Sequence, residues 1–157
     1  TSDSASRANH GGYLPWERQS LLCVACVGKK NPGPMAARDL YASDWFRKAS
    51  TYAAREADEW YILSAKYGLV SPKTVIEPYN ETLNRMPAAA RRIWAERVMG
   101  DLTQQLRPSD EVIILAGQRY RANLLDPLQR MGCTVQIPMQ GLRIGEQLAW
   151  LNERLGR

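Results

Sequence analysis

Cysteine and histidine are scarce in this chain of 157 residues, which has three cysteines and a single histidine. An odd number of cysteines argues against a disulfide framework, so a reducing cytoplasm is the expected compartment. Cys23 and Cys26 have the Cys-x-x-Cys spacing of redox and zinc sites, but they lie inside an apolar run. No second pair completes a zinc site, and His10 lies in the N-terminal segment. We therefore expect buried strand cysteines, no metal and no cofactor.

Long apolar segments are also absent. No run approaches the ~20 residues that a membrane-spanning helix needs. The N-terminal residues lack the apolar segment of a signal peptide. We expect no membrane partner, a flexible leader at residues 1–18, and one α/β domain at residues 19–157, which is long enough to bury a core.

Negative charge is in the minority. The chain has 21 lysines and arginines against 16 aspartates and glutamates, so its net charge is +5. This balance favours a polyanionic partner, either nucleic acid or a phosphorylated substrate.

Apolar runs alternate with helical patterns along the chain. We predict buried strands at residues 20–27, 60–64, 111–116 and 133–137. Helices are predicted after a cap at Ser43 or Asp44, after Pro87, at residues 120–131 and at residues 145–155. Trp45, Trp94 and Trp150 are expected in the core. This alternation predicts a three-layer α/β/α sandwich around a mainly parallel sheet of about four strands.

The loops that follow the four strands contain most of the polar and glycine-containing segments. They are residues 28–38, 65–86, 117–120 and 138–144. The carboxyl ends of parallel strands meet at one edge of a sheet, so these loops are expected to form the site together. The second loop is unusually long, which is typical of functional loops.

The first two loops contain candidate phosphate and base contacts. Lys29 and Lys30 precede a Gly-Pro turn, and this segment suits the binding of a phosphate. The alternative is a solvated turn without a ligand. The pattern is not a Walker motif. Ser64 and Lys66 leave the strand together, in a segment that continues to Gly68. They could form a Ser-Lys nucleophile, or Lys66 could contact a phosphate or carboxylate. Tyr67 and Tyr79 are candidates for stacking on a base, and packing is the alternative for each.

Candidate catalytic groups follow in the second loop. Pro78 holds Glu77 in an extended conformation, so this carboxylate and the Asn80 amide are candidates to activate water. A capping or ion-pairing acid is the alternative for Glu77.

The third loop opens a helix. Its backbone N–H groups form a potential anion site at Gly117. Gln118 can read a base edge, Arg119 can contact phosphate, and Tyr120 completes the segment. The alternative is an ordinary strand-to-helix turn. Residues 140–147 again mix glycines with polar groups and are expected to close the pocket.

Several of these segments together resemble a known family. The most specific are Ser-Ala-Lys-Tyr-Gly-Leu at residues 64–69 and Pro-Tyr-Asn at residues 78–80. Residues 21–156 resemble a bacterial family of uncharacterised domains that is distantly similar to the YaaA peroxide-stress proteins. The resemblance implies DNA binding and protection during oxidative stress, on a core similar to nucleobase-handling folds such as DNA glycosylases.

Two main functions remain open. The first is an N-glycosidase acting on a base or nucleotide. Here Tyr67 or Tyr79 would stack on the base, Gln118 would read it, and Glu77 with Asn80 would orient water. Its phosphate contacts would be Lys29, Lys66 and Arg119. The alternative is a non-catalytic DNA-binding stress-protection protein of YaaA type. A small-molecule nucleotide binder is a third reading of the same loops.

Overall fold

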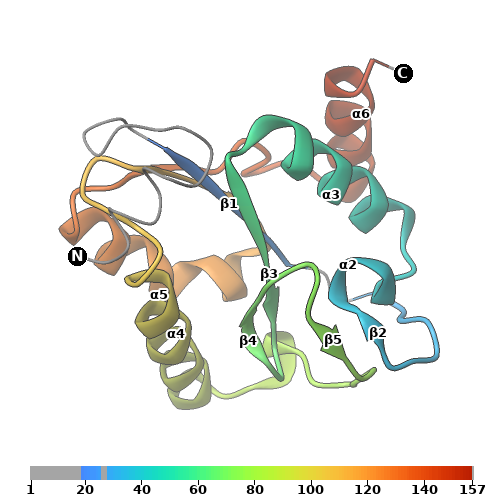
Figure 1. The fold of residues 1–157 in the computed structure, drawn as a ribbon, viewed down its shortest axis with the longest axis horizontal. Coiled ribbons are helices and arrows are strands. Elements are labelled where there is room, and N and C mark those ends of the chain that lie inside the picture. The colour runs from blue at the N-terminus through green and yellow to red at the C-terminus, as the bar shows by residue number, and fades with distance from the viewer. Residues whose placement is uncertain (1–18, 26–27, 157) are drawn as a thin grey trace.

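The central sheet has five strands. The computed structural model describes residues 19–25 and 28–156, and Figure 1 shows their arrangement. Along the sheet the strand order is β4-β3-β1-β6-β7. The strands are β1 (Ser20–Ala25), β3 (Glu59–Ser64), β4 (Gly68–Val70), β6 (Glu111–Leu115) and β7 (Thr134–Gln136). Neighbouring strands are parallel except β4, which is antiparallel to β3.

The remaining elements connect these strands. A second, two-stranded sheet pairs β2 (Met35–Ala36) with β5 (Val75–Ile76) in antiparallel orientation. The helices are α2 (Ala37–Leu40), α3 (Asp44–Glu56), α4 (Ala88–Leu102), α5 (Gln118–Arg130) and α6 (Ile144–Arg154), with a 3₁₀ turn η1 (Leu83–Arg85) before α4.

The mainly parallel sheet is confirmed, but the predicted number of about four strands is one too low. The four predicted strands correspond to β1, β3, β6 and β7, and the four predicted helices to α3 to α6. The prediction missed β4 because it has only three residues and pairs with β3 through a tight turn. Gly68 permits that turn with a φ of 78°. The predicted leader at residues 1–18 lies outside the described residues.

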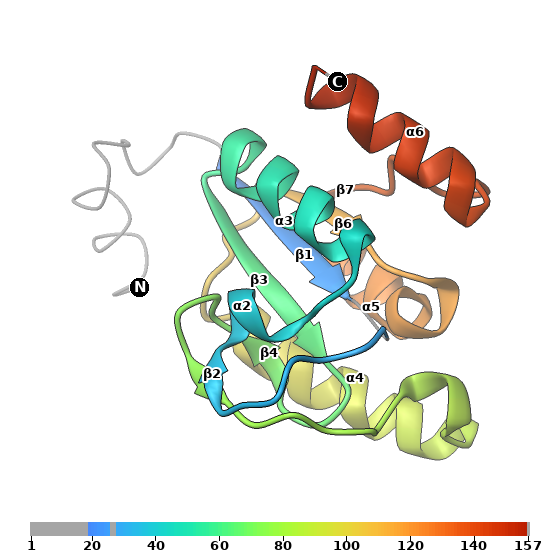
Figure 2. The same ribbon diagram turned by 90° about the vertical axis from the view of Figure 1, so that its right-hand side faces the viewer.

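The four longer helices, α3 to α6, fall into two pairs. Helix α3 contacts β1, β3 and α6, whereas α4 contacts β4 and α5, and α5 contacts β7. Figures 1 and 2 show the two pairs apart from one another, with strands of the sheet between them in Figure 1. Helix α3 begins where the sequence predicts, because the Ser43 hydroxyl accepts a hydrogen bond from the backbone N–H of Phe46 at 3.0 Å.

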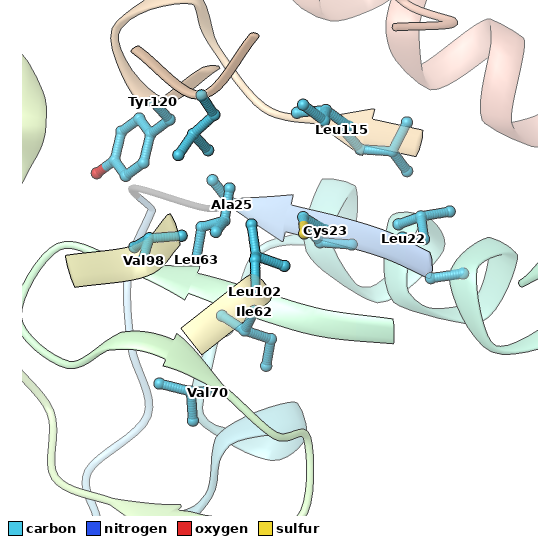
Figure 3. Packing of buried hydrophobic residues seen from close by; sticks show 14 of the residues in the cluster. Leu22, Cys23, Ala25, Ile62, Leu63, Val70, Val98, Leu102, Leu115 and Tyr120 are labelled. Atoms are coloured by element: carbon cyan, nitrogen blue, oxygen red, sulfur yellow. The ribbon is translucent and has the colours of Figure 1, made fainter. Parts of the chain in front are cut away.

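The core is continuous across the sheet. Strand β1 is buried along its last five residues, and Figure 3 shows its side chains gathered with those of β3, β6 and α4. Cys23 and Cys133 are buried as expected, and desolvation raises the pKa of Cys23 to about 12. This burial keeps the Cys23 thiol protonated at neutral pH. The other half of the predicted Cys-x-x-Cys pair, Cys26, lies outside the described residues.

The strand order has a consequence for the site. The chain passes from β1 to β3 on one side of β1, and later to β6 on its other side. Ligands of open α/β sheets bind at the carboxyl ends of the strands where the order reverses in this way. The junction of β1 and β6 is therefore the place to look for a site. No helix among the described residues is long and apolar enough to cross a membrane.

Candidate functional site

A cavity of about 690 Å³ lies at the carboxyl ends of β1 and β6. We call it the switch-point cavity. Ala25 and Leu115 line it at the ends of these strands, and Trp45, Gly117, Arg121 and Gln147 line it from the helices. Its position matches the place where the strand order reverses, as expected for a ligand site in this fold class.

The N-terminal ends of three helices meet around this cavity. Ser43 caps α3, and the Glu146 carboxylate accepts a hydrogen bond from the backbone N–H of Arg143 at the start of α6. Helix α5 begins after Gly117 without a hydrogen bond from any capping side chain. The first N–H groups of a helix have no partner within it, and they favour negative charge. Helix α5 therefore offers the most open anion-binding end of the three.

Arg121 adds a positive charge at this end. Its Nη1 donates a hydrogen bond of 2.8 Å to the backbone carbonyl of Ala116, which holds the guanidinium beside Gly117. Within the described residues, its other nitrogens make no hydrogen bond, so they remain able to contact a ligand. An uncapped helix end and a guanidinium together make this part of the cavity electropositive.

An apolar, aromatic part of the cavity lining comes from Trp45, which is half-buried. Its indole N–H donates to the side-chain oxygen of Gln147 at 2.9 Å, and the amide nitrogen of Gln147 donates to the Leu142 carbonyl at 2.9 Å. The sequence predicts Trp45 as a core residue. It does pack against the core, and Gln147 also fixes its ring as a flat wall of the cavity.

A second cavity, of about 720 Å³, adjoins the first. We call it the basic cavity, because Lys29, Lys30 and Arg85 line it against the single carboxylate of Glu81. Asn80 also lines it. The two cavities share Gly28 as a common lining residue.

Lys30 is held in place by two tyrosines. Its ammonium lies 4.3 Å from the centroid of the Tyr79 ring and 5.6 Å from that of Tyr41. The two tyrosine hydroxyls are 2.6 Å apart and buried. The Tyr79 ring also makes an edge contact with Tyr67, at 5.8 Å between centroids. These contacts surround the Tyr79 ring, so its position suits packing and the orientation of Lys30 better than stacking on a base.

The segment from Ser64 to Gly68 forms the turn between β3 and β4. The Ser64 side chain is fully buried, and its hydroxyl accepts a hydrogen bond from the backbone N–H of Tyr67 at 3.0 Å. Lys66 is exposed, and its carbonyl accepts a hydrogen bond from Arg97. Gly68 has a φ of 78°, and a Cβ there would lie 3.0 Å from Arg97 Nε. Both facts favour glycine at this position, so Gly68 shapes the turn. None of these residues lines either cavity.

The structure thus brings together some of the predicted site residues and separates others. Gly117 and Gln118 line the switch-point cavity, and Lys29, Lys30, Tyr79 and Asn80 line the basic cavity. Glu77 and Arg119 are exposed and line neither. Gln147, in the segment 140–147 that was expected to close the pocket, lines the switch-point cavity. Sequence reasoning missed Arg121, Glu81 and Arg85, since their position in a cavity depends on how distant segments pack. Among the described residues, no cluster of acidic, histidine and cysteine side chains is suited to a metal.

Tyr120 is buried and connects two segments. Its hydroxyl accepts a hydrogen bond from the backbone N–H of Leu83 and lies 3.3 Å from the Thr82 hydroxyl. This contact joins α5 to η1, beside the basic cavity.

We expect Tyr120→Phe to lower the free energy of unfolding by about 1–3 kcal/mol, because the buried Leu83 N–H loses its acceptor. Urea denaturation measures this change. Tyr67→Phe is the matched control, and its expected change is below about 0.5 kcal/mol because no hydrogen bond of that hydroxyl occurs among the described residues. Equal losses in the two variants would contradict the role of the Tyr120 hydroxyl.

Comparisons with known proteins place the chain in a family. It belongs to the family described as "Family of unknown function (DUF6884)", whose model matches residues 21–153. It is similar to "Uncharacterized protein YfjM" of Bacillus subtilis (strain 168), with 32% identity over 117 residues, which are 66% of this chain and 73% of that protein. No solved structure gives a significant match. The expected similarity to YaaA proteins stays a prediction.

Proposed function

We propose that the protein is a nucleobase-directed N-glycosidase that holds the base in the switch-point cavity. The observation that carries this proposal is the meeting of the uncapped end of α5, Arg121 and the fixed Trp45 ring in one cavity. The proposal includes a three-layer α/β/α sandwich, which the two helix pairs support.

The cavity suits a flat heterocycle with polar edges. Its volume of about 690 Å³ falls within the range of about 300–1,000 Å³ typical of ligand sites. The Trp45 ring offers a face for stacking, which any base can use. Gln118 is exposed at the cavity and can donate to and accept from a base edge.

The electropositive end of the cavity suits the chemistry of a departing base. When an N-glycosidic bond breaks, the base takes the bonding electrons and negative charge develops on its ring. Donors that are already oriented toward such charge lower the barrier, because they need no reorganisation during the reaction. We assign this role to the N–H groups at the start of α5 and to the Arg121 guanidinium, which lie in one cavity.

The sugar that the base leaves behind is cation-like, and a carboxylate stabilises it. Water then adds to its anomeric carbon and gives a proton to that carboxylate, while the departing base takes up a proton. Glu81 and Asn80 line the basic cavity, which adjoins the base cavity at Gly28. A sugar near Gly28 would lie between the two cavities. We assign this carboxylate role to Glu81 rather than to Glu77, because Glu77 lies outside both cavities.

A non-catalytic DNA-binding protein is the second candidate. The excess of lysine and arginine favours it, as do the three cations of the basic cavity. DNA binding without any release of base would support this candidate over the first.

Arg121→Ala tests the base site by calorimetric titration with free nucleobases and nucleosides. We expect affinity to fall about 10- to 100-fold, which corresponds to about 1.5–3 kcal/mol for a hydrogen bond to a charged group. Arg119→Ala removes the same charge from the same helix but outside both cavities, and we expect less than a twofold change. Thermal unfolding checks that both variants fold. Equal affinities in the two variants, or no binding to the wild-type protein, would overturn the proposal.

A further inference from the structure

The basic cavity is larger and more charged than a single phosphate requires. Its volume is about 720 Å³, and Lys29, Lys30 and Arg85 converge on it from two segments that are far apart in the sequence. Lys29 and Arg85 are exposed. Lys30 is half-buried, and its ammonium lies over the rings of Tyr41 and Tyr79. Three cations of this kind suit several anionic groups at neighbouring positions.

We propose that the basic cavity binds the phosphodiester backbone on either side of the target nucleotide, so that the substrate is single-stranded nucleic acid. This inference rests on the proposed function, since it requires the base to occupy the switch-point cavity. It names the substrate class of that site.

The adjacency of the two cavities supports a strand rather than a free nucleoside. Each cavity by itself has the size of a site for one small ligand. Because Gly28 lines both, a chain whose base enters the switch-point cavity has its sugar and phosphates next to the three cations. A nucleoside would leave the basic cavity empty.

The position of Trp45 in the wall of the switch-point cavity supports a single strand rather than a duplex. A base must leave the stack and its pairing partner to reach a pocket at the end of a sheet, and an unpaired base does so at the lowest cost. Cations along the backbone combined with an aromatic face for the base are the usual means of binding single strands.

The restraint on Lys30 fits this role as well. The Tyr41 and Tyr79 rings lie under its ammonium, and the Gly28 carbonyl lies 3.4 Å from its Nζ. Gly28 is the residue that the two cavities share. The positive charge is thereby held at the junction through which the sugar-phosphate chain would pass.

Affinity for ligands of increasing length tests the inference. We expect a trinucleotide to bind the wild-type protein at least tenfold more tightly than a nucleoside. The Lys29→Ala/Arg85→Ala double variant is expected to lose most of this gain while its affinity for the nucleoside stays within twofold. Lys73→Ala, at an exposed lysine outside both cavities, is the control and is expected to retain the gain.

The salt dependence gives a second readout. For a trinucleotide that carries a 5′-phosphate, and therefore three phosphates in all, the logarithm of affinity is expected to fall with the logarithm of salt concentration with a slope of about −2, at about 0.7 per contacted phosphate. The double variant should show a slope of about −0.7. A slope that does not change between the two proteins would overturn the inference.

The outcomes separate the inference from the proposed function. If nucleosides bind and Arg121→Ala weakens them, but the trinucleotide binds no more tightly, the inference fails and the proposed function stands. If a nucleoside triphosphate exceeds the nucleoside in affinity by as much as the trinucleotide does, the assignment to nucleic acid is wrong. If no base, nucleoside or strand binds, both fail.

Discussion

Replacing Glu81 by glutamine is expected to lower the rate of base release at least 100-fold, with little change in substrate affinity. A carboxylate that activates water or stabilises the sugar cation contributes about 10²- to 10⁴-fold to a rate. Glutamine has nearly the same shape but no negative charge, so it retains the packing of the basic cavity. Base release from a labelled single-stranded oligonucleotide, under single-turnover conditions, measures the rate without interference from product release.

Glu77→Gln is the matched control for this experiment. It makes the same chemical change four residues earlier, at an exposed position outside both cavities. We expect its rate of base release to remain within about twofold of the wild type. If Glu77→Gln abolishes release and Glu81→Gln does not, the assignment of the catalytic carboxylate is wrong. If the wild-type protein binds the strand and releases no base, the non-catalytic candidate is favoured.

The second large effect concerns the support of the site rather than its chemistry. Phe46 is 1% exposed in α3, directly after Trp45, and its ring centroid is 4.7 Å from that of Tyr41. It therefore packs against Tyr41, one of the two tyrosines that restrain Lys30. Phe46→Ala is expected to lower the free energy of unfolding by about 3–5 kcal/mol, because it removes buried contacts and leaves a cavity.

Urea denaturation measures this loss, and two variants calibrate it. Phe46→Leu keeps most of the volume and is expected to cost less than about 1.5 kcal/mol. Ile93→Ala truncates a side chain that is 68% exposed on α4, and its expected change is within about 0.5 kcal/mol. A loss in Phe46→Ala no greater than that in Ile93→Ala would contradict the central position of Phe46.

The regular elements were predictable because their signals are local. The run from Leu21 to Ala25 is apolar without interruption, as expected of a strand buried on both faces. Ser43, one of the two predicted caps of α3, is the observed cap. The short elements β2, β4 and β5 were missed, because two or three residues carry no periodicity. Strand β2 pairs with the distant β5, whereas β4 pairs with β3 through a tight turn.

The candidate site was predicted less completely. The sequence pointed to Ser64 and Tyr67 because they follow a buried strand, but the antiparallel return of β4 makes this segment a tight hairpin turn packed near α4. Arg121 was missed in favour of Arg119. Which of two arginines on one helix faces a cavity depends on the rotation of that helix against the sheet, and this is a property of packing.

By itself, the sequence determined the alternation of strands and helices, the mainly parallel sheet and the loops in which ligand contacts were to be sought. Hydrophobic periodicity and capping residues act over a few neighbours, so they can be read along the chain. The tertiary structure decided that β1 and β6 are neighbours, and that Gly28 joins a cavity beside Trp45 and Arg121 to one beside Lys30 and Glu81. Those contacts form between residues up to about a hundred positions apart, as between Trp45 and Gln147, and only the packing of the whole domain brings them together.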